Sequence, residues 1–255
     1  MPYDLVLKVK GSLVIIQNWF VVTIISICFK RSHKDDALVR IGSTYGGWWV
    51  PEWILMDSSR ARSAVSVGLG FDVSFDERLL EAGFYVLGMD PLLDSIRSTN
   101  HDLAKYGNRD TINAGLWVHS GQAIFYRPKI DSHDSWSIVN SQQTSVSDAE
   151  SFPTLNMKEI QKKYPKVDAN DYLILKMDIE GAELDILEGL CEQSFKCNLL
   201  AVEIDSLSLI SFLSIFKRIK TVIRTLSLCS QLKSLDYRLA KTEGYNFHWI
   251  RNLSK

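Results

Sequence analysis

Short apolar runs alternate with amphipathic stretches along the middle of the chain. The run "SAVSVGL" (63–69) is rich in valine and ends at glycine, which is typical of a buried strand. "SFDERLLEAG" (74–83) begins with serine, has acids in its first turn and ends at glycine, so it predicts a short helix. "FYVLGMD" (84–90) predicts the next strand, and "PLLDSIRSTNHDLAKYG" (91–107), with proline at its start, predicts the next helix. This alternation is typical of an α/β fold, a parallel sheet with helices on both faces.

The same alternation continues toward the C-terminus. We predict strands over residues 111–119, 123–128, 171–181 and 198–205, and helices over residues 154–164, 182–190 and 207–234. The final stretch, "LDYRLAKTEGYNFHWIR" (235–251), predicts a hairpin around Glu243-Gly244, so the last strands should run antiparallel at one edge. Residues 129–151 are polar, rich in serine and without periodicity, and we expect them to form a loop over one end of the sheet.

The N-terminal segment differs from the rest of the chain. Residues 11–29 carry no formal charge and just reach the roughly 20 residues that a membrane span needs, although Gln17 and Asn18 weaken that interpretation. A helix packed on the domain or lying on a membrane, a signal anchor and a cleaved signal peptide all remain open. We divide the chain into an apolar helical segment (1–35) and one domain (36–255). The basic residues after the segment would keep that domain cytoplasmic, with membrane contact through residues 11–29 left open.

Composition narrows the class of protein. The net charge of -1 over 255 residues argues against a nucleic-acid protein that relies on a basic field. The four cysteines form no CxxC pair, which favours a reducing compartment over a disulfide framework.

A glycine turn follows the first predicted strand of the domain. Gly68, Gly70 and Asp72 lie where α/β sheets bind ligands, beyond the carboxyl end of a strand. Asp90 ends the next strand, 22 positions after Gly68, and an acid about 20 positions on can bind ribose hydroxyls. Val73 stands where the dinucleotide fingerprint has its third glycine, and Asp72 would repel a pyrophosphate but can pair with an ammonium group. Among cofactors the pattern indicates S-adenosylmethionine, but on this motif alone a purely structural turn is the favoured interpretation until a second site is found.

Acidic residues cluster in a second segment, "LKMDIEGAELDILEGL" (175–190). Asp178 and Glu180 come at the mouth of a buried strand, where a carboxylate needs a partner or a purpose. Glu203, in "LLAVEID" (199–205), ends the adjacent strand, so three carboxylates should face one crevice. Such a cluster could hold a divalent cation, but no histidine lies beside it in the sequence and we assign no metal site.

Six segments together resemble the FkbM-type methyltransferases, which depend on S-adenosylmethionine. They are, in order, "YGGWWVP" (45–51), "SVGLGFDVSFD" (66–76), "VLGMDP" (86–91), the acidic segment 175–190, "LLAVEID" and "GYNFHWI" (244–250). The resemblance implies a Rossmann-like fold whose seven-stranded mixed sheet has the order 3-2-1-4-5-7-6, with the last strand antiparallel. It implies S-adenosylmethionine over Gly68, Gly70 and Asp72, with its ribose at Asp90. It also implies that Asp178 and Glu180 lie near the methionine end of the cofactor and the acceptor.

The predicted function is O-methyl transfer to a hydroxyl of a sugar, glycolipid or small natural product. Asp178 or Glu180 would remove the proton of the acceptor hydroxyl, and Glu203 and Trp48 would contact the acceptor. A non-catalytic, membrane-associated Rossmann-like binding module is the alternative. Val73 and Asp72 disfavour a nicotinamide-dependent oxidoreductase.

Overall fold

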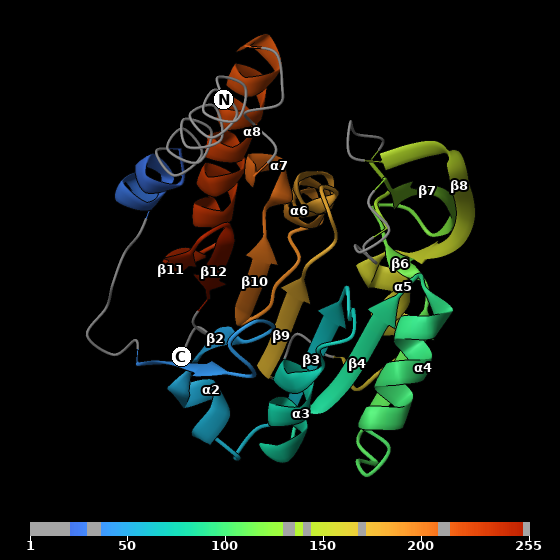
Figure 1. Cartoon of the computed structure of the whole chain (residues 1–255). Helices are drawn as coiled ribbons and strands as arrows, with labels where there is room; N and C mark the ends of the chain where they lie inside the picture. The colour runs from blue at the N-terminus through green and yellow to red at the C-terminus, as the bar shows by residue number, and fades with distance from the viewer. Residues whose placement is uncertain are drawn as a thin grey trace, which may run out of the picture.

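A seven-stranded mixed sheet forms the centre of the protein (Figure 1). The computed structural model describes residues 21–29, 37–129, 136–139, 144–167, 172–208 and 215–251. The sheet order is β11-β12-β10-β9-β3-β4-β5, and β12 is antiparallel to both of its neighbours. Counted along the chain and read from β5, this order is 3-2-1-4-5-7-6, so the predicted topology is confirmed. The strands are β3 (Arg62–Val67), β4 (Tyr85–Asp90), β5 (Arg109–Asn113), β9 (Tyr172–Met177), β10 (Leu199–Glu203), β11 (Arg238–Glu243) and β12 (Asn246–Ile250).

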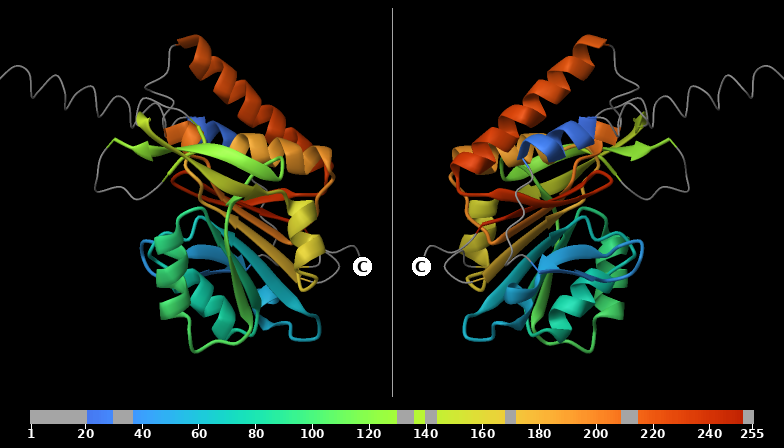
Figure 2. Two further views of the ribbon diagram at one scale, coloured as in Figure 1. Left: turned by 90° about the vertical axis from the view of Figure 1, so that its right-hand side faces the viewer. Right: turned by 90° about the vertical axis from the view of Figure 1, so that its left-hand side faces the viewer.

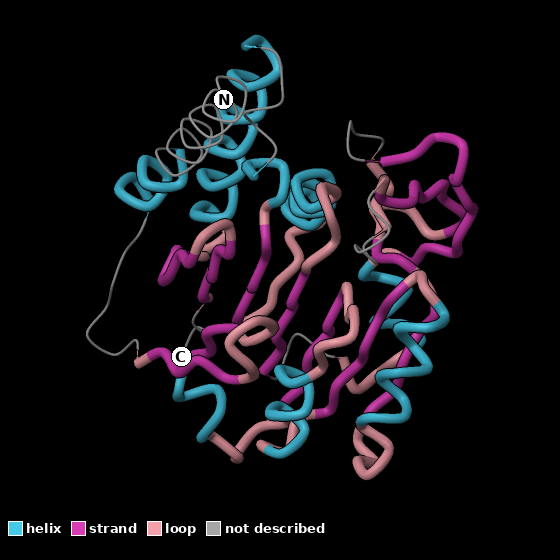
Figure 3. Tube along the Cα trace, in the orientation of Figure 1, coloured by secondary structure: helices cyan, strands magenta, loops and turns pink. Residues whose placement is uncertain are grey.

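Helices cover both faces of this sheet, as Figures 2 and 3 show. They are α2 (Glu52–Met56), α3 (Ser74–Glu81), α4 (Leu93–Asp102), α5 (Met157–Lys163), α6 (Glu183–Glu192), α7 (Asp205–Ser208) and α8 (Ile215–Ser234). Alternate residues of the central strands enter two hydrophobic cores: Leu173 and Leu175 pack on the side of α6 and α8, and Ile174 packs on the side of α2 and α3. Every residue of β4 and β9 is buried, which explains why these strands read as continuous apolar runs.

Two small sheets are added to this frame. A hairpin of β1 (Leu38–Ile41) and β2 (Trp48–Pro51) packs beside α3, and the sequence pattern did not predict it. The second sheet has the order β6-β8-β7, with β6 (Gly115–Leu116), β7 (Gly121–Pro128) and β8 (Thr144–Leu155).

The second sheet corrects two predictions. Residues 144–151 were expected in a loop but belong to β8, which pairs antiparallel with β7 from Gly121↔Thr154 to Pro128↔Thr144. Most of the described side chains in β8 are at least partly exposed, so the strand has no apolar alternation to reveal it. The predicted strand 111–119 is also divided, because the chain leaves the main sheet after β5 and enters the second sheet at β6.

The described part of the N-terminal segment is a helix over residues 21–29. Val22 and Ile25 pack into the main core, and the Ser26 Oγ lies 2.8 Å from the Thr242 Oγ1 on β11. Within the described residues, none of the helices combines the length and apolar character that crossing a bilayer requires. Residues 11–20 of the predicted apolar segment lie outside the described residues, as do residues 209–214 between α7 and α8.

Candidate active site

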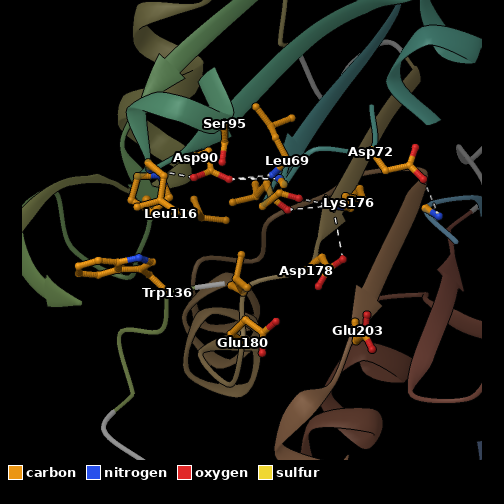
Figure 4. Close-up of a pocket in the computed structure, with 18 of the residues that line it drawn as sticks. Leu69, Asp72, Asp90, Ser95, Leu116, Trp136, Lys176, Asp178, Glu180 and Glu203 are labelled. Carbon is orange, nitrogen blue, oxygen red and sulfur yellow. Dashed lines mark hydrogen bonds and ion pairs between the residues drawn. The ribbon is translucent and has the colours of Figure 1, made fainter. Parts of the chain in front are cut away.

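A cavity of about 790 Å³ opens at the carboxyl ends of β3, β4, β9 and β10. This volume is within the range of about 300–1,000 Å³ found for small-molecule sites. Among the described residues, seven carboxyl side chains and one lysine line it. The glycine turn forms one half of its wall and the acidic segment forms the other (Figure 4).

Gly68 brings the glycine turn against the end of the neighbouring strand. Its φ is +74°, and a Cβ at this position would lie 1.7 Å from the carbonyl oxygen of Asp178. Gly70 has a φ of +55°, but a Cβ there would have no neighbour within 4 Å. Gly68 is therefore needed for close packing, whereas Gly70 is needed for its backbone conformation alone.

Asp90 holds the glycine turn from the end of β4. Its Oδ2 accepts hydrogen bonds from the backbone N–H of Leu69 at 3.0 Å and of Gly70 at 3.4 Å, and its Oδ1 accepts one from Leu92 at 2.8 Å. Burial raises the pKa of Asp90, and these three hydrogen bonds oppose that shift. An ionised carboxylate offers about four acceptor positions, so one remains for a ligand hydroxyl.

Asp72 joins the glycine turn to the β1–β2 hairpin. It accepts hydrogen bonds from the Ser43 hydroxyl at 2.5 Å, from the Gly46 N–H at 3.1 Å and from the Ser74 N–H at 3.0 Å. Partial burial alone would raise its pKa, but these hydrogen bonds outweigh burial and lower it. Asp72 borders the cavity as predicted, with its carboxylate engaged by the hairpin.

Lys176 lies between the two halves of the cavity, and sequence reasoning missed it. Its Nζ donates hydrogen bonds to the carbonyl oxygens of Gly68 at 2.5 Å and Val67 at 3.3 Å, and lies 3.8 Å from the Asp178 Oδ2. The same Nζ lies 5.7 Å from the centre of the Trp48 ring. A lysine within the apolar strand "YLILKM" was the available signal, because a buried charge needs partners.

The acidic half crowds several carboxyl groups together. Carboxylate oxygens of Asp178, Glu180 and Asp205 lie within 4.8 Å of one another, a geometry that could hold a metal ion. Burial, together with the charges of Asp178 and Glu180, raises the pKa of Glu203 to about 7.

Two more carboxyl groups of this region, Asp205 in the cavity lining and Glu183 buried outside it, have raised pKa values. Burial and the charges of Glu183 and Glu180 raise the pKa of Asp205 to about 10. Burial raises the pKa of Glu183 to about 8, against an opposing hydrogen bond from the Gly181 N–H. The acidic half can therefore both hold and accept protons near neutral pH, which general acid–base chemistry requires.

Two aromatic residues, one on β7 and one in the segment before β8, also border the cavity. Phe125 of β7 and Trp136 line the cavity, and both rings meet Phe152 of β8 edge-on, with centroids 5.5 Å and 5.4 Å away. The Ser137 hydroxyl donates to the Glu180 carbonyl at 2.5 Å and so ties this wall to the acidic segment. Trp136 falls in the stretch that was expected to be a loop, and it was not among the predicted site residues.

The remaining predicted residues border the same cavity. Glu203 lies at its edge, and Trp48 lies beneath Lys176, 3% exposed and tilted against His248 at 5.6 Å. All eight predicted site residues therefore meet at one cavity, and their individual roles remain predictions. The eight are Trp48, Gly68, Gly70, Asp72, Asp90, Asp178, Glu180 and Glu203.

Comparison with known proteins gives a family. The model of the methyltransferase FkbM domain matches residues 65–239, well over half of the chain. A structure of the fibrillarin pre-rRNA processing protein of Methanococcus jannaschii aligns over 87% of this chain and 84% of its own, with 8% identity and a TM-score of 0.38. No curated protein matches the sequence significantly. The chain belongs to the FkbM family and is an S-adenosylmethionine-dependent methyltransferase.

Proposed function

We propose that this enzyme methylates a hydroxyl group of a sugar, glycolipid or small natural product. The observation that carries the proposal is the crowded carboxyl cluster beside the glycine turn. A hydroxyl is a weak nucleophile until its proton is removed, and a carboxylate within hydrogen-bond reach can remove it.

The charge of the cavity fits S-adenosylmethionine. The ionised members of the seven carboxyl groups in the described lining would repel a phosphate-bearing cofactor, and the ammonium of the one lysine in that lining is already bound to carbonyl oxygens. A cofactor with a sulfonium and an ammonium group, and with no phosphate, is favoured by the same field.

The cofactor would lie along the glycine turn. The remaining acceptor position of Asp90 would bind its ribose, and Leu92 and Leu116 would flank its adenine. Gly70 leaves open space beside the backbone, and Asp72 holds the hairpin that closes this end. The methionine end would then point toward Asp178 and Glu180.

Within this arrangement the carboxylates do the proton chemistry. When bound, S-adenosylmethionine supplies a methyl group on a positively charged sulfur. Its transfer to the acceptor oxygen would form a C–O bond, break the C–S bond and leave S-adenosylhomocysteine. Asp178 or Glu180 takes the hydroxyl proton, while Glu203 orients the acceptor. Alignment of the reacting atoms would supply much of the rate.

Trp136 and Phe125 indicate which acceptors fit. Their rings add apolar surface to a cavity that carboxyl groups also line, so the acceptor should combine an apolar part with hydroxyl groups. The same carboxyl groups disfavour acceptors that bear phosphate or carboxylate groups.

The test is methyl transfer from isotopically labelled S-adenosylmethionine to a panel of neutral sugars, glycolipids and polyols. We expect the label on an acceptor oxygen, with equal release of S-adenosylhomocysteine, and loss of transfer in Asp178→Asn or Glu180→Gln. Label found on a nitrogen or a carboxylate would contradict the proposal. Cofactor binding without transfer to any acceptor would favour the non-catalytic alternative.

A further inference from the structure

Exposed apolar side chains gather at the end of the molecule where the cavity opens. On α8, Phe216, Ile219 and Ile223 are 82%, 52% and 61% exposed. Their spacing of three and four residues places them on one face of the helix, and we call them the α8 stripe.

The α8 stripe belongs to the part of the helix that projects from the domain. Leu228 and Leu232, farther along α8, are buried in the main core. The other half of α8 rises beyond the carboxyl ends of β9 and β10, the end of the sheet at which the cavity opens (Figure 1). Packing of α8 against the sheet therefore does not explain why the residues of the α8 stripe are apolar.

Three other elements add exposed apolar residues at this end. The helix over residues 21–29 buries Val22 and Ile25 but leaves Ile27 77% exposed. β7 and β8 reach beyond the same edge of the sheet in both views (Figures 1 and 2), with Ile124 48% and Val146 65% exposed. Exposed apolar residues therefore occur at this end of the molecule on elements other than α8.

The projecting half of α8 is also basic. Lys217 and Lys220 are exposed beside the stripe, and α8 contains no acidic residue. Arg224 is different, because it pairs with Glu188 and Asp185 at 2.7 Å and 2.6 Å and so belongs to the domain. Exposed lysines next to an apolar helix face are typical of helices that lie on anionic lipid surfaces.

We propose that this end of the protein docks on an anionic membrane surface. The α8 stripe enters the interface, Lys217 and Lys220 contact the lipid headgroups, and Ile27, Ile124 and Val146 flank the contact. A symmetric dimer through the same face is disfavoured, because it would bring the lysines of the two copies together. The docked orientation turns the cavity mouth toward the headgroups. A lipid-linked hydroxyl acceptor would lie there, and this last step rests on the proposed function.

The test is sedimentation of the full chain with vesicles of phosphatidylcholine alone or mixed with phosphatidylglycerol. We expect binding to the mixed vesicles, reduced by roughly tenfold or more when two large apolar residues are removed in Phe216→Ser/Ile219→Ser. Lys217→Glu/Lys220→Glu should remove the dependence on phosphatidylglycerol. The matched control is Met56→Ser, because Met56 is 74% exposed on α2, at the opposite end of the molecule (Figure 1).

Three results would overturn the proposal: no vesicle binding by the folded chain, equal binding by the stripe variant and the wild type, or a dimer that the stripe substitutions dissociate. Circular dichroism and S-adenosylmethionine binding establish that each variant is folded. Since the stripe lies outside the cavity, cofactor binding should be unchanged in every variant, so failure of docking is separable from failure of the proposed function.

Discussion

The two halves of the cavity use carboxyl groups in opposite ways. In the glycine-turn half, Asp72 and Asp90 each accept three hydrogen bonds, mostly from backbone N–H groups. In the acidic half, carboxyl groups are crowded against one another, and the pKa values of Glu203 and Asp205 rise to about 7 and about 10. The hydrogen-bonded carboxylates hold the glycine turn in place, whereas the crowded carboxyl groups can take up and release protons. The first half is suited to holding a ligand and the second to reacting with one.

Removing the base of the acidic half should have the largest effect. We expect Asp178→Asn or Glu180→Gln to lower kcat by about 10²–10⁴-fold, the usual contribution of a general base. The measurement is kcat with the best acceptor from the panel. Asp185→Asn is the matched control, since Asp185 lies in the same segment but pairs with Arg224 outside the cavity. If both cavity variants retain kcat as this control does, neither residue is the base.

The two glycines of the turn should differ in their effect on stability. Gly68→Ala forces a Cβ onto the Asp178 carbonyl and should lower the free energy of unfolding by about 3 kcal/mol or more. Gly70→Ala meets no atom within 4 Å, so its positive φ alone should cost about 1 kcal/mol. Urea unfolding followed by circular dichroism measures both. Equal losses would mean that the close approach of the turn to β9 contributes nothing.

Glu183 should make stability depend on pH in a stated direction. Its pKa rises from an ordinary 4.5 to about 8 in the folded protein, so its contribution is fully present below about pH 4.5 and is lost as the pH rises toward about 8. Glu183→Gln stays neutral and should gain on the wild type over this window, by on the order of 1–3 kcal/mol at pH 8. The exposed Glu192→Gln at the end of α6 serves as control and should follow the wild type. A constant difference between Glu183→Gln and the wild type from pH 5 to pH 8 (about the window of the shift) would refute this account.

The aromatic wall should have the smallest effect. Trp136→Ala removes one ring from the cavity and should raise the acceptor KM by up to about tenfold, with little change in kcat. Trp49→Ala is a suitable control, because the Trp49 indole donates to Glu243 and lies outside the cavity lining. An unchanged KM in Trp136→Ala would remove this wall from the acceptor site.

Periodicity along the chain predicted the alternating strands and helices, and the resemblance to a known family supplied the sheet order. In the structure, the eight predicted site residues lie at one cavity. The strand predictions succeeded because strands buried on both faces leave continuous apolar runs. The eight residues lie together because residues that follow the carboxyl ends of parallel strands share one edge of the sheet, and their roles stay predictions. β8 was not predicted, because a strand that lies away from the core does not alternate between apolar and polar residues.

Lys176 and Asp205 were not among the predicted site residues for another reason. Each is a single charged residue in the sequence, and its role depends on which strand lies beside it in the fold. Lys176 matters because parallel pairing sets it beside Ser66 of β3, next to the start of the glycine turn. Such neighbours depend on tertiary contacts, which local sequence patterns do not encode.

The most direct test is isothermal titration of the full-length protein with S-adenosylmethionine and S-adenosylhomocysteine, repeated on Asp90→Ala. The control is Asp94→Ala, which removes an exposed carboxylate four residues farther along the chain, on α4. We expect micromolar binding of both ligands that Asp90→Ala weakens and Asp94→Ala leaves unchanged. A folded protein that binds neither ligand, or binds them equally well without the Asp90 carboxylate, would contradict the cofactor site on the glycine turn.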